Sequence, residues 1–496
     1  MGAREVPDVF DVLIIGAGPA GCASARLLAA WGHRVLVVHR ADGERSRLAE
    51  SIPPSAQKVL AAIGALPAIE DAGFLPWRGN TVWWGDDTPR VETFPSGVAG
   101  YQVARHAFDR RLRELARSAG AELRTGIVRD VDLGRMPAAV VEIEGQSDPV
   151  SASFVLDCSG RAGVIASRGR RRTASPHTIA LAGIWRLPGG WSGISDTETL
   201  VASYTDGWAW SVPTEPGTRH FTVMVDPART GLAREQSSRV VYLSELAKVH
   251  PFGPLLEGAS LVGNPFGADA SPYEAVQYAG TNFLLVGDAA SFIDPLSSFG
   301  VKKALASGWL AAIVTHTALT RPAMRATALE FHDRRERELY SSAVRQTARF
   351  AAEATRSGVA HPFWLARAAD RDAPDVDAGI DVAALRRDPD VVAAFDDLRR
   401  RASVHLQGGA DVRVELRAAV GGREIALLDH LVLPCWPGGI RYLRNVDLLA
   451  LWRAAPVHTD IGDLCAALEK RQPGAALPDV LGALAVLIAR GALRHR

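Results

Sequence analysis

An apolar run at residues 10–15 opens the regular pattern of the chain and leads directly into a glycine-rich turn, Gly16-Ala-Gly-Pro-Ala-Gly21. A helical stretch around residues 27–30 follows, and a second apolar run covers residues 34–38. Short, continuous apolar runs are typical of buried parallel strands. The pattern therefore predicts strand, glycine turn, helix and strand within about thirty residues, which is the order of a dinucleotide-binding motif.

The three glycines of this turn have separate physical roles. Gly16 permits the tight turn, Gly18 lets a pyrophosphate approach the backbone, and Gly21 lets the helix pack against the strand. The helix N-terminus then offers unpaired N–H groups to the phosphates. The other turn residues expected to contact the cofactor are Ala17, Pro19 and Ala20.

The second strand ends at His39 and Arg40, where an acidic residue usually binds the ribose hydroxyls. A histidine also hydrogen-bonds a hydroxyl, so FAD remains possible, whereas Arg40 could instead accommodate the 2′-phosphate of NADP. A second motif, Asn282-Phe-Leu-Leu-Val-Gly-Asp-Ala-Ala290, favours FAD. It resembles the second FAD fingerprint of glutathione-reductase-type and hydroxylase-type flavoproteins, in which an apolar strand runs into Gly287-Asp288 and a helix. The resemblance implies that Asp288 holds the ribityl chain.

Further segments resemble the flavin-dependent aromatic monooxygenases and halogenases. They are Glu50-Ser51-Ile-Pro-Pro, Val103-Ala-Arg105, Asp157-Cys-Ser-Gly-Arg161 and, similar to the WxWxIP signature of the halogenases, Gly207-Trp-Ala-Trp-Ser-Val-Pro213. Residues 292–301 resemble the loop and helix start that lie against the isoalloxazine ring. The resemblance covers roughly residues 8–330. The cofactor contacts that it implies are Glu50, Ser51, Arg105, Val128, Gly287, Pro295, Gly300 and Val301.

Oxygen chemistry at a reduced flavin requires a dry site, which aromatic walls such as Trp208 and Trp210 would provide. Backbone N–H groups around Ser298, Phe299 and Gly300 could stabilise negative charge at a helix start. These five residues are the predicted catalytic set. The alternative for the two tryptophans is simple packing, because positions two apart share one face of a strand.

Halogenases also depend on a lysine that relays hypohalous acid to the substrate, in the segment after the Glu50-Ser51 motif. Here that stretch, residues 74–85, offers Arg78 and no lysine. An arginine stays protonated and is a poor relay, so the sequence favours direct hydroxylation. Lys58, Lys302 and Lys303 are interpreted as ordinary helix surface.

The last part of the chain changes in character. Residues 370–390 look like a charged connector, and residues 431–443 predict two strands around a Pro-Gly-Gly turn. Three amphipathic helices follow at 445–452, 459–468 and 477–493, with polar caps at Asn445 and Thr459. This order is similar to the small winged-helix domain of the PQQ-biosynthesis D type, which implies binding of a leader peptide at a sheet edge. The alternative is a module that only packs or mediates dimerisation.

Charge and cysteine usage exclude several classes of protein. The 56 Lys and Arg residues balance 55 Asp and Glu residues, so no nucleic-acid tract is indicated. The four cysteines have no CxxC spacing and no histidine cluster, so we expect no metal site and no disulfide framework. The first residues have neither a signal-peptide pattern nor an apolar stretch long enough for a membrane. We therefore expect a cytoplasmic protein without a membrane or nucleic-acid partner.

Taken together, these features predict an α/β fold: an FAD-binding Rossmann-like domain (8–174 and 276–350) with an inserted antiparallel β-sheet substrate domain (175–275). A helical connector (351–410) would lead to a winged-helix-like α+β recognition module (411–496). The predicted function is FAD-dependent hydroxylation of an aromatic, tryptophan-like side chain in a peptide or protein, with O2 as co-substrate. NAD(P)H would act indirectly, through a separate flavin reductase. The alternatives are a flavin-dependent halogenase, a geranylgeranyl-reductase-like prenyl saturase and a non-enzymatic peptide chaperone.

Overall fold

The structure, a computed structural model, describes residues 8–41, 48–134, 137–143, 146–166, 171–173, 177–191, 194–234, 236–297, 299–355, 361–368, 382–401, 403–444, 446–470 and 476–496. Contacts divide the chain into two units, Met1–Pro374 and Asp375–Arg496. Each unit is described by itself, and the finer domain boundaries stay predictions.

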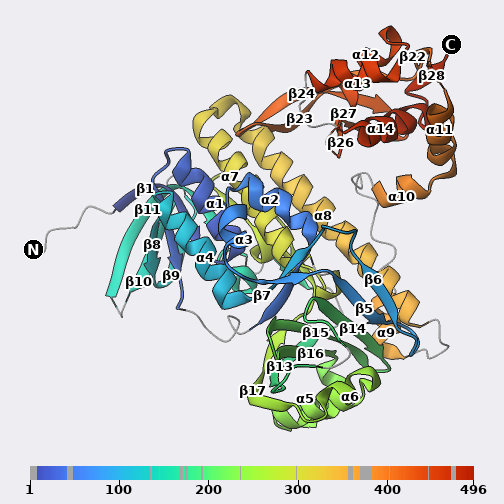
Figure 1. Cartoon of the computed structure of the whole chain (residues 1–496). Coiled ribbons are helices and arrows are strands. Elements are labelled where there is room, and N and C mark those ends of the chain that lie inside the picture. Colours follow the sequence, from blue (N-terminus) through green and yellow to red (C-terminus); the bar gives the residue numbers. More distant parts are fainter. Residues whose placement is uncertain are drawn as a thin grey trace, which may run out of the picture. The chain divides into compact units, whose positions relative to one another are not determined.

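The first unit contains a mainly parallel sheet, whose strands β1, β11, β8, β9 and β10 are seen at the left of Figure 1. Its central strand, β1 (Asp8–Ile15), pairs in parallel with β2 (Val35–His39) on one side and with β11 (Gln146–Asp157) on the other. Segments 12–15, 35–38 and 154–156 of these strands are apolar and buried, because both faces of the sheet are covered there. The remaining strands of this sheet are β8 (Glu122–Thr125), β9 (Ile127–Asp132), β10 (Ala138–Ile143), β19 (Ala279–Gly280) and β20 (Phe283–Leu285).

Two helices of this domain, which are far apart in the sequence, pack against each other through small residues. Helix α1 (Pro19–Ala30) packs against α7 (Gly300–Thr320), and the Ser24 hydroxyl donates to the carbonyl of Gly308 at 2.9 Å. A Cβ on Gly308 would lie only 2.3 Å from the Ala20 carbonyl oxygen, so the crossing requires glycine there. The other long helices of the unit are α4 (Arg105–Ser118), which packs on α1, and α8 (Arg325–Ala354), which packs on α7.

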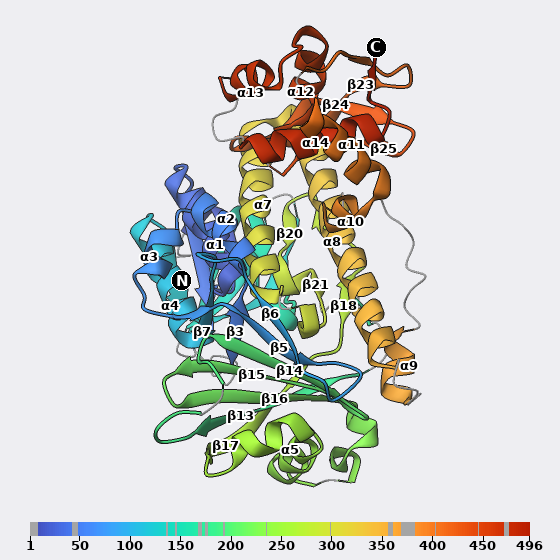
Figure 2. The same cartoon turned by 45° about the vertical axis from the view of Figure 1, so that its right-hand side comes forward.

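A seven-stranded sheet makes the second layer, in the order β17-β13-β16-β15-β14-β5-β6. These strands are β17 (Ser260–Asp269), β13 (Ile179–Arg186), β16 (Thr218–Val225), β15 (Gly207–Glu215), β14 (Glu198–Tyr204), β5 (Gly79–Trp83) and β6 (Arg90–Thr93). Strand β5 pairs in parallel with β14, so the sheet includes residues outside the 175–275 segment expected for it. Helix α5 (Ser238–Ala247) packs against β13, β16 and β17 (Figure 2).

A small three-stranded sheet links the two layers. It consists of β3 (Ala49–Ile52), β7 (Gly100–Ala104) and β4 (Leu75–Trp77). The buried Ser51 hydroxyl lies 2.7 Å from the side-chain oxygen of Gln102 and 2.6 Å from the Thr199 hydroxyl on β14. This side-chain network fixes the seven-stranded sheet to the segment that follows the first nucleotide motif.

The second unit has its own hydrophobic core, with Leu431, Leu448 and Leu484 fully buried. Its elements are α10 (Val382–Arg387), α11 (Pro389–Arg400), β22 (Leu406–Gly408), β23 (Arg413–Gly421), β24 (Glu424–Leu433), β25 (Trp436–Ile440), β26 (Tyr442–Leu443), β27 (Val446–Asp447), α12 (Leu448–Ala454), α13 (Ile461–Glu469), α14 (Leu477–Ala489) and β28 (Leu493–His495). The three helices predicted from the sequence are present, but the third ends at Ala489 instead of Leu493, which begins β28.

Details of this unit differ from the prediction. The chain reverses at Pro434 and Cys435, and the Pro-Gly-Gly sequence lies inside β25. The pairing of β24 with β25 is irregular there, and Gly439 has φ +79°, so the glycines form a bulge rather than the turn. The caps of α12 and α13 are Asp447 and Asp460, since their carboxylates accept backbone N–H groups; Thr459 is not the cap, and Asn445 lies outside the described residues.

Within the described ranges, helices that combine enough length with enough apolar character to cross a membrane are absent.

Candidate functional site

The glycine turn between β1 and α1 has the geometry of a phosphate cradle. Gly16 has φ +106°, and a Cβ there would lie 2.5 Å from the carbonyl oxygen of Cys158. A Cβ on Gly21 would lie 1.9 Å from the Gly16 oxygen, whereas a Cβ on Gly18 would meet nothing within 4 Å. Gly16 and Gly21 are thus required by the protein itself, and Gly18 faces open space at the start of α1. This is the arrangement that a pyrophosphate needs.

The second fingerprint touches the first. Gly287 follows β20 with φ +63°, and a Cβ on it would lie 3.0 Å from the Cβ of Ala20. The helix expected directly after Gly287-Asp288 is only a single 3-10 turn, Gly287–Ala289, and α7 begins at Gly300. The positive φ of Gly287 and the pairing of β21 (Ser291–Phe292) with β18 (Tyr273–Ala275) turn the chain away before a longer helix can form.

A cluster of charged side chains lies beside these turns. Arg105, the first residue of α4, bonds Asp109 at 3.1 Å and approaches Glu50 at 3.5 Å. Burial raises the pKa of Glu50, the nearby charge of Asp288 raises it further, and Arg105 opposes both effects. The nearby carboxylates hold the pKa of Arg105 above its usual value despite its burial. The structure therefore places Glu50 and Arg105 in contact and Asp288 near enough for its charge to affect both, whereas their contacts with FAD stay predictions.

Lys303 belongs to the same region. It is 7% exposed on α7, and its Nζ donates to the carbonyls of Gly287 (3.0 Å) and Ser291. The Nζ also lies 3.8 Å from the Asp288 carboxylate. The interpretation of Lys303 as ordinary helix surface is wrong, because sequence periodicity does not show which side of an almost fully buried helix faces a polar turn.

The other residues predicted to contact the cofactor differ in their burial and in their hydrogen-bond partners. His39 is half-buried at the end of β2, with its Nδ1 2.8 Å from the carbonyl of Arg40, and Arg40 is exposed. The Ser51 hydroxyl is engaged in the network with Gln102 and Thr199. Val128 is buried on β9 in the core of the parallel sheet. Ala17, Pro19 and Ala20 are buried in the glycine turn and the first turn of α1.

The loop at residues 292–299 leads into α7. Asp294 is buried and its carboxylate accepts the N–H of Leu296 at 2.9 Å; burial raises its pKa, while Arg367 and this hydrogen bond oppose the shift. Phe299 precedes α7, and Gly300 begins it, with no atom within 4 Å of the position that a Cβ would take. Pro295 is half-buried, Val301 is buried, and Ser298 lies outside the described residues.

Trp208 and Trp210 lie on β15 with their rings stacked, 4.9 Å apart between centroids and 29° between planes. They belong to an apolar cluster that also includes Phe292 and Leu296 of the loop before α7. Two tryptophans that the sequence did not single out, Trp84 and Trp364, pack edge to face in the same cluster with centroids 5.4 Å apart. Strand β15 thus presents an aromatic surface toward the loop that precedes α7.

The position of Trp364 could not be read from the sequence. It lies on α9 (Pro362–Ala368), and its Nε1 donates to the Tyr204 carbonyl at 2.9 Å, a sequence separation of 160. Trp84 carried a weak signal, since it directly follows β5 and a tryptophan in an aromatic strand often packs on its neighbours.

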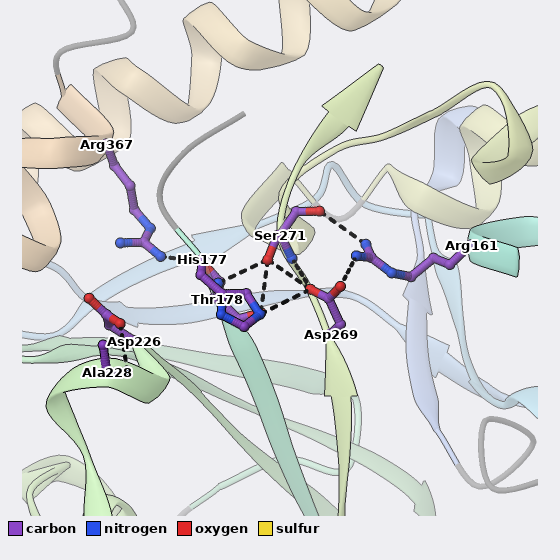
Figure 3. A network of polar contacts seen from close by, with 8 residues as sticks. All are labelled: Arg161, His177, Thr178, Asp226, Ala228, Asp269, Ser271 and Arg367. Carbon is purple, nitrogen blue, oxygen red and sulfur yellow. Dashed lines mark hydrogen bonds and ion pairs between the residues drawn. The ribbon is translucent and has the colours of Figure 1, made fainter. Parts of the chain in front are cut away.

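Two arginines reach the junction of β13 and β17 from opposite sides (Figure 3). Arg161 pairs with Asp269 at 2.6 Å, and its guanidinium lies 4.3 Å from the centre of the Phe292 ring. Arg367, on α9, bonds the Thr178 hydroxyl and the Phe363 carbonyl, and burial lowers its pKa to about 10. Ser271 links the two sides, because it bonds both Asp269 and Thr178. This network fixes α9 and the loop at Phe292 to the seven-stranded sheet.

Comparisons with known proteins agree with this geometry. The sequence profile of the tryptophan halogenase family matches residues 87–404, and that of an FAD binding domain matches residues 11–56. The tryptophan 2-halogenase of Chondromyces crocatus is 29% identical over 344 residues, which cover 66% of this chain and 65% of the relative. The chain thus spans slightly less than two thirds of that relative's length.

Solved structures with the same fold extend over nearly the whole chain. The flavin-dependent halogenase CmlS superposes with a TM-score of 0.76 at 23% identity, over 99% of this chain and 96% of that one. The peptidyl tryptophan dihydroxylase QhpG superposes with a TM-score of 0.65 at 24% identity, over 97% and 99% of the two chains.

The profile match covers more than half of the chain, and the flavin fold is shared with solved family structures. These matches confirm FAD as the predicted cofactor and the predicted α/β fold. The chain belongs to the tryptophan halogenase family.

Proposed function

We propose that the chain uses reduced FAD and O2 to hydroxylate the ring of an aromatic, tryptophan-like substrate. When bound, FAD supplies the electrons that activate oxygen. One oxygen atom enters a ring C–H bond as a hydroxyl group, the other leaves as water, and two electrons come from reduced FAD. The cluster at Trp208 and Trp210 excludes water and offers a surface on which an aromatic ring packs. The N-terminus of α7 at Gly300 favours negative charge.

The observation that supports hydroxylation is the lack of a lysine in residues 74–85, the segment that leads to Trp84 of the aromatic cluster. Residues 74–85 run through β4 and β5 to Trp84 without a lysine, and Arg78 is exposed at the start of β5. A protonated guanidinium is a poor acceptor of an electrophilic halogen. Direct transfer of oxygen to a substrate ring needs no amine relay, so the chain has the groups that hydroxylation requires.

The second unit supports a peptide or protein as the substrate. Strand β23 pairs only with β24, so its other edge is unpaired within the described part of its sheet. An extended peptide can add to such an edge through main-chain hydrogen bonds. The neighbour QhpG, whose name describes it as a peptidyl tryptophan dihydroxylase, covers both units of this chain. The likeness of this unit to the PQQ-biosynthesis D type stays a prediction.

Halogenation is the second candidate, and the relatives favour it, since the Chondromyces protein and CmlS are both named halogenases. Lys302 is a candidate for the relay lysine that halogenation requires. Lys302 is half-buried with its Nζ 4.9 Å from the centre of the Phe299 ring, and burial together with the neighbouring Lys58 lowers its pKa. A lower pKa leaves more of the amine in the neutral, nucleophilic form.

The deciding experiment is intact-mass analysis of peptides encoded near this gene, and of free tryptophan, after incubation with the enzyme, reduced FAD, O2 and bromide. A mass gain of one oxygen atom that does not depend on bromide supports hydroxylation. Bromine incorporation that is lost in Lys302→Ala overturns it in favour of halogenation. Modification of free tryptophan but of none of the peptides overturns the peptide substrate.

A further inference from the structure

We propose that Lys303 is a positioning residue of the FAD site: it clamps the Gly287–Ser291 segment and favours the reduced, anionic form of FAD over the oxidised form. The proposal rests on FAD as the cofactor and is independent of whether the reaction is hydroxylation or halogenation.

The contacts of Lys303 close the turn that carries Asp288. Its Nζ donates to the carbonyl of Gly287 at 3.0 Å and to the carbonyl of Ser291, which lie at the two ends of that segment. The third neighbour is the Asp288 carboxylate, at 3.8 Å. Outside this segment, the Tyr273 hydroxyl donates to the Asp288 carbonyl at 2.5 Å. The turn is therefore held from both sides, and Lys303 provides the only charge among these contacts apart from Asp288 itself.

Burial of the Lys303 ammonium group is unfavourable unless contacts within the protein replace its lost hydration. An ammonium group removed from water is costly unless it is hydrogen-bonded and paired. Two carbonyls and one carboxylate supply this compensation for Lys303, which is 7% exposed. The adjacent Lys302 has very different surroundings, because its Nζ lies on the Phe299 ring. The two lysines are thus not interchangeable, and only Lys303 is directed at the fingerprint.

The charge balance explains why the oxidation state of FAD should matter. Arg105 lies 3.5 Å from Glu50 and 3.1 Å from Asp109, and Asp288 lies 3.8 Å from Lys303. Besides burial, the charges of Asp288 and Asp109 both raise the pKa of Glu50. Two cations, Arg105 and Lys303, oppose these three carboxylates. Reduced flavin adds a further negative charge. Without Lys303 that charge would enter a region with a larger excess of carboxylates, so the reduced form would lose more stabilisation than the oxidised form.

The test compares Lys303→Met, which keeps the length of the side chain and removes the charge, with Lys303→Arg, which keeps the charge. Lys248→Met is the control for loss of a paired lysine charge elsewhere, because the Lys248 Nζ at the end of α5 contacts the carboxylates of Asp206 and Glu245. The measurements are the Kd of oxidised FAD, from quenching of its fluorescence, and the midpoint potential, from equilibration with a reference dye. Thermal unfolding of the apoprotein reports the structural effect separately.

We expect Lys303→Met to weaken binding of oxidised FAD about tenfold, as for loss of a charged hydrogen-bond donor. Binding of reduced FAD should weaken about tenfold more, which lowers the two-electron midpoint potential by about 30 mV. Lys303→Arg and Lys248→Met should keep the potential of the unmodified enzyme.

Equal weakening of both forms by Lys303→Met, with an unchanged potential, would overturn the proposal and leave Lys303 a purely structural residue. An unchanged affinity for FAD would overturn it as well. If Lys303→Met does not yield folded protein, Asp288→Asn decides. Removal of the carboxylate beside Lys303 should raise the potential, and an unchanged or lowered potential in that variant contradicts the proposal.

Discussion

Ala20 and Gly287 lie in direct contact, since a Cβ on Gly287 would come within 3.0 Å of the Ala20 Cβ although the two residues are far apart in the sequence. This contact joins the glycine turn after β1 to the Gly-Asp turn after β20. Both turns lie at the carboxyl ends of parallel strands in one sheet, where ligands of such folds bind. The two fingerprints are therefore parts of one site, and substitutions in them can be separated by what each side chain would meet.

Gly18→Ala should weaken FAD binding by about tenfold or more, because a Cβ there enters the space in which the pyrophosphate approaches the backbone. The fold should lose no more than about 1 kcal/mol, the cost of alanine instead of glycine at the N-cap of α1, since Gly18 has φ −78° and no atom lies within 4 Å of the new Cβ. Gly21→Ala provides the contrast: its Cβ would lie 1.9 Å from the Gly16 oxygen, so stability should fall by about 1–3 kcal/mol. Urea unfolding and FAD titration of both variants check this, and a Gly18→Ala apoprotein that is as unstable as Gly21→Ala contradicts it.

Trp364→Ala should destabilise the first unit by about 3–5 kcal/mol, the usual cost of truncating a buried aromatic residue. The side chain is 3% exposed, packs on Trp84 and loses a hydrogen bond to Tyr204 when it is truncated. Leu365→Ala is the control, because Leu365 is 49% exposed on the same helix and should change stability by less than about 0.5 kcal/mol. Similar unfolding midpoints for the two variants would show that α9 does not depend on the aromatic cluster.

Arg367→Met should release α9 from the sheet. The guanidinium bonds Thr178 and Phe363, and its charge opposes the burial of Asp294. Its removal leaves the Thr178 hydroxyl and the Phe363 carbonyl without their charged donor, and a hydrogen bond to a charged group contributes about 1.5–3 kcal/mol. Hydrogen exchange at residues 362–368 should accelerate, and Arg367→Lys should restore part of the protection. Exchange rates equal to those of the unmodified protein would show that Arg367 does not hold α9 to the sheet.

The stability of the enzyme should fall as the pH is lowered through about 6.5, the usual value for histidine in an unfolded chain. Burial, followed by the charge of His316, lowers the pKa of His33, while Asp11 opposes the shift. The His33 Nε2 lies 2.8 Å from the His316 Nδ1 across the contact between the end of α1 and α7. Because the unfolded state binds the proton more readily than the folded state, this contribution is intact above the unfolded pKa and is lost below it.

Urea unfolding at pH 8.0 and pH 5.5 measures this effect. His33→Gln should reduce the difference between the two pH values, because a glutamine keeps a hydrogen-bonding side chain but does not titrate. His177→Gln is a suitable control, since His177 is 60% exposed and lies 3.9 Å from Asp269. A pH dependence that His33→Gln leaves unchanged would assign it to other groups.

The sequence by itself determined the local parts of this protein. The apolar runs and glycines of the first forty residues determined β1, the glycine turn, α1 and β2. The backbone conformation and burial of these elements depend mainly on residues that are neighbours in the sequence. The motifs at Glu50, Arg105 and Asp288 were recognised by resemblance, and the structure brings those side chains together. The three helices of the last part were likewise visible in their apolar spacing.

Only the tertiary structure decided how distant segments meet. The spacing of apolar residues cannot show that β5 joins the seven-stranded sheet through β14, because that pairing depends on a crossover between layers. It also cannot show that Trp364 completes the aromatic cluster, or that the glycines of β25 form a bulge rather than a turn. Lys303 is the sharpest case. On a helix that is buried on most sides, its place beside Asp288 depends on the crossing of α7 with the Gly287 turn, and no local pattern encodes such a crossing.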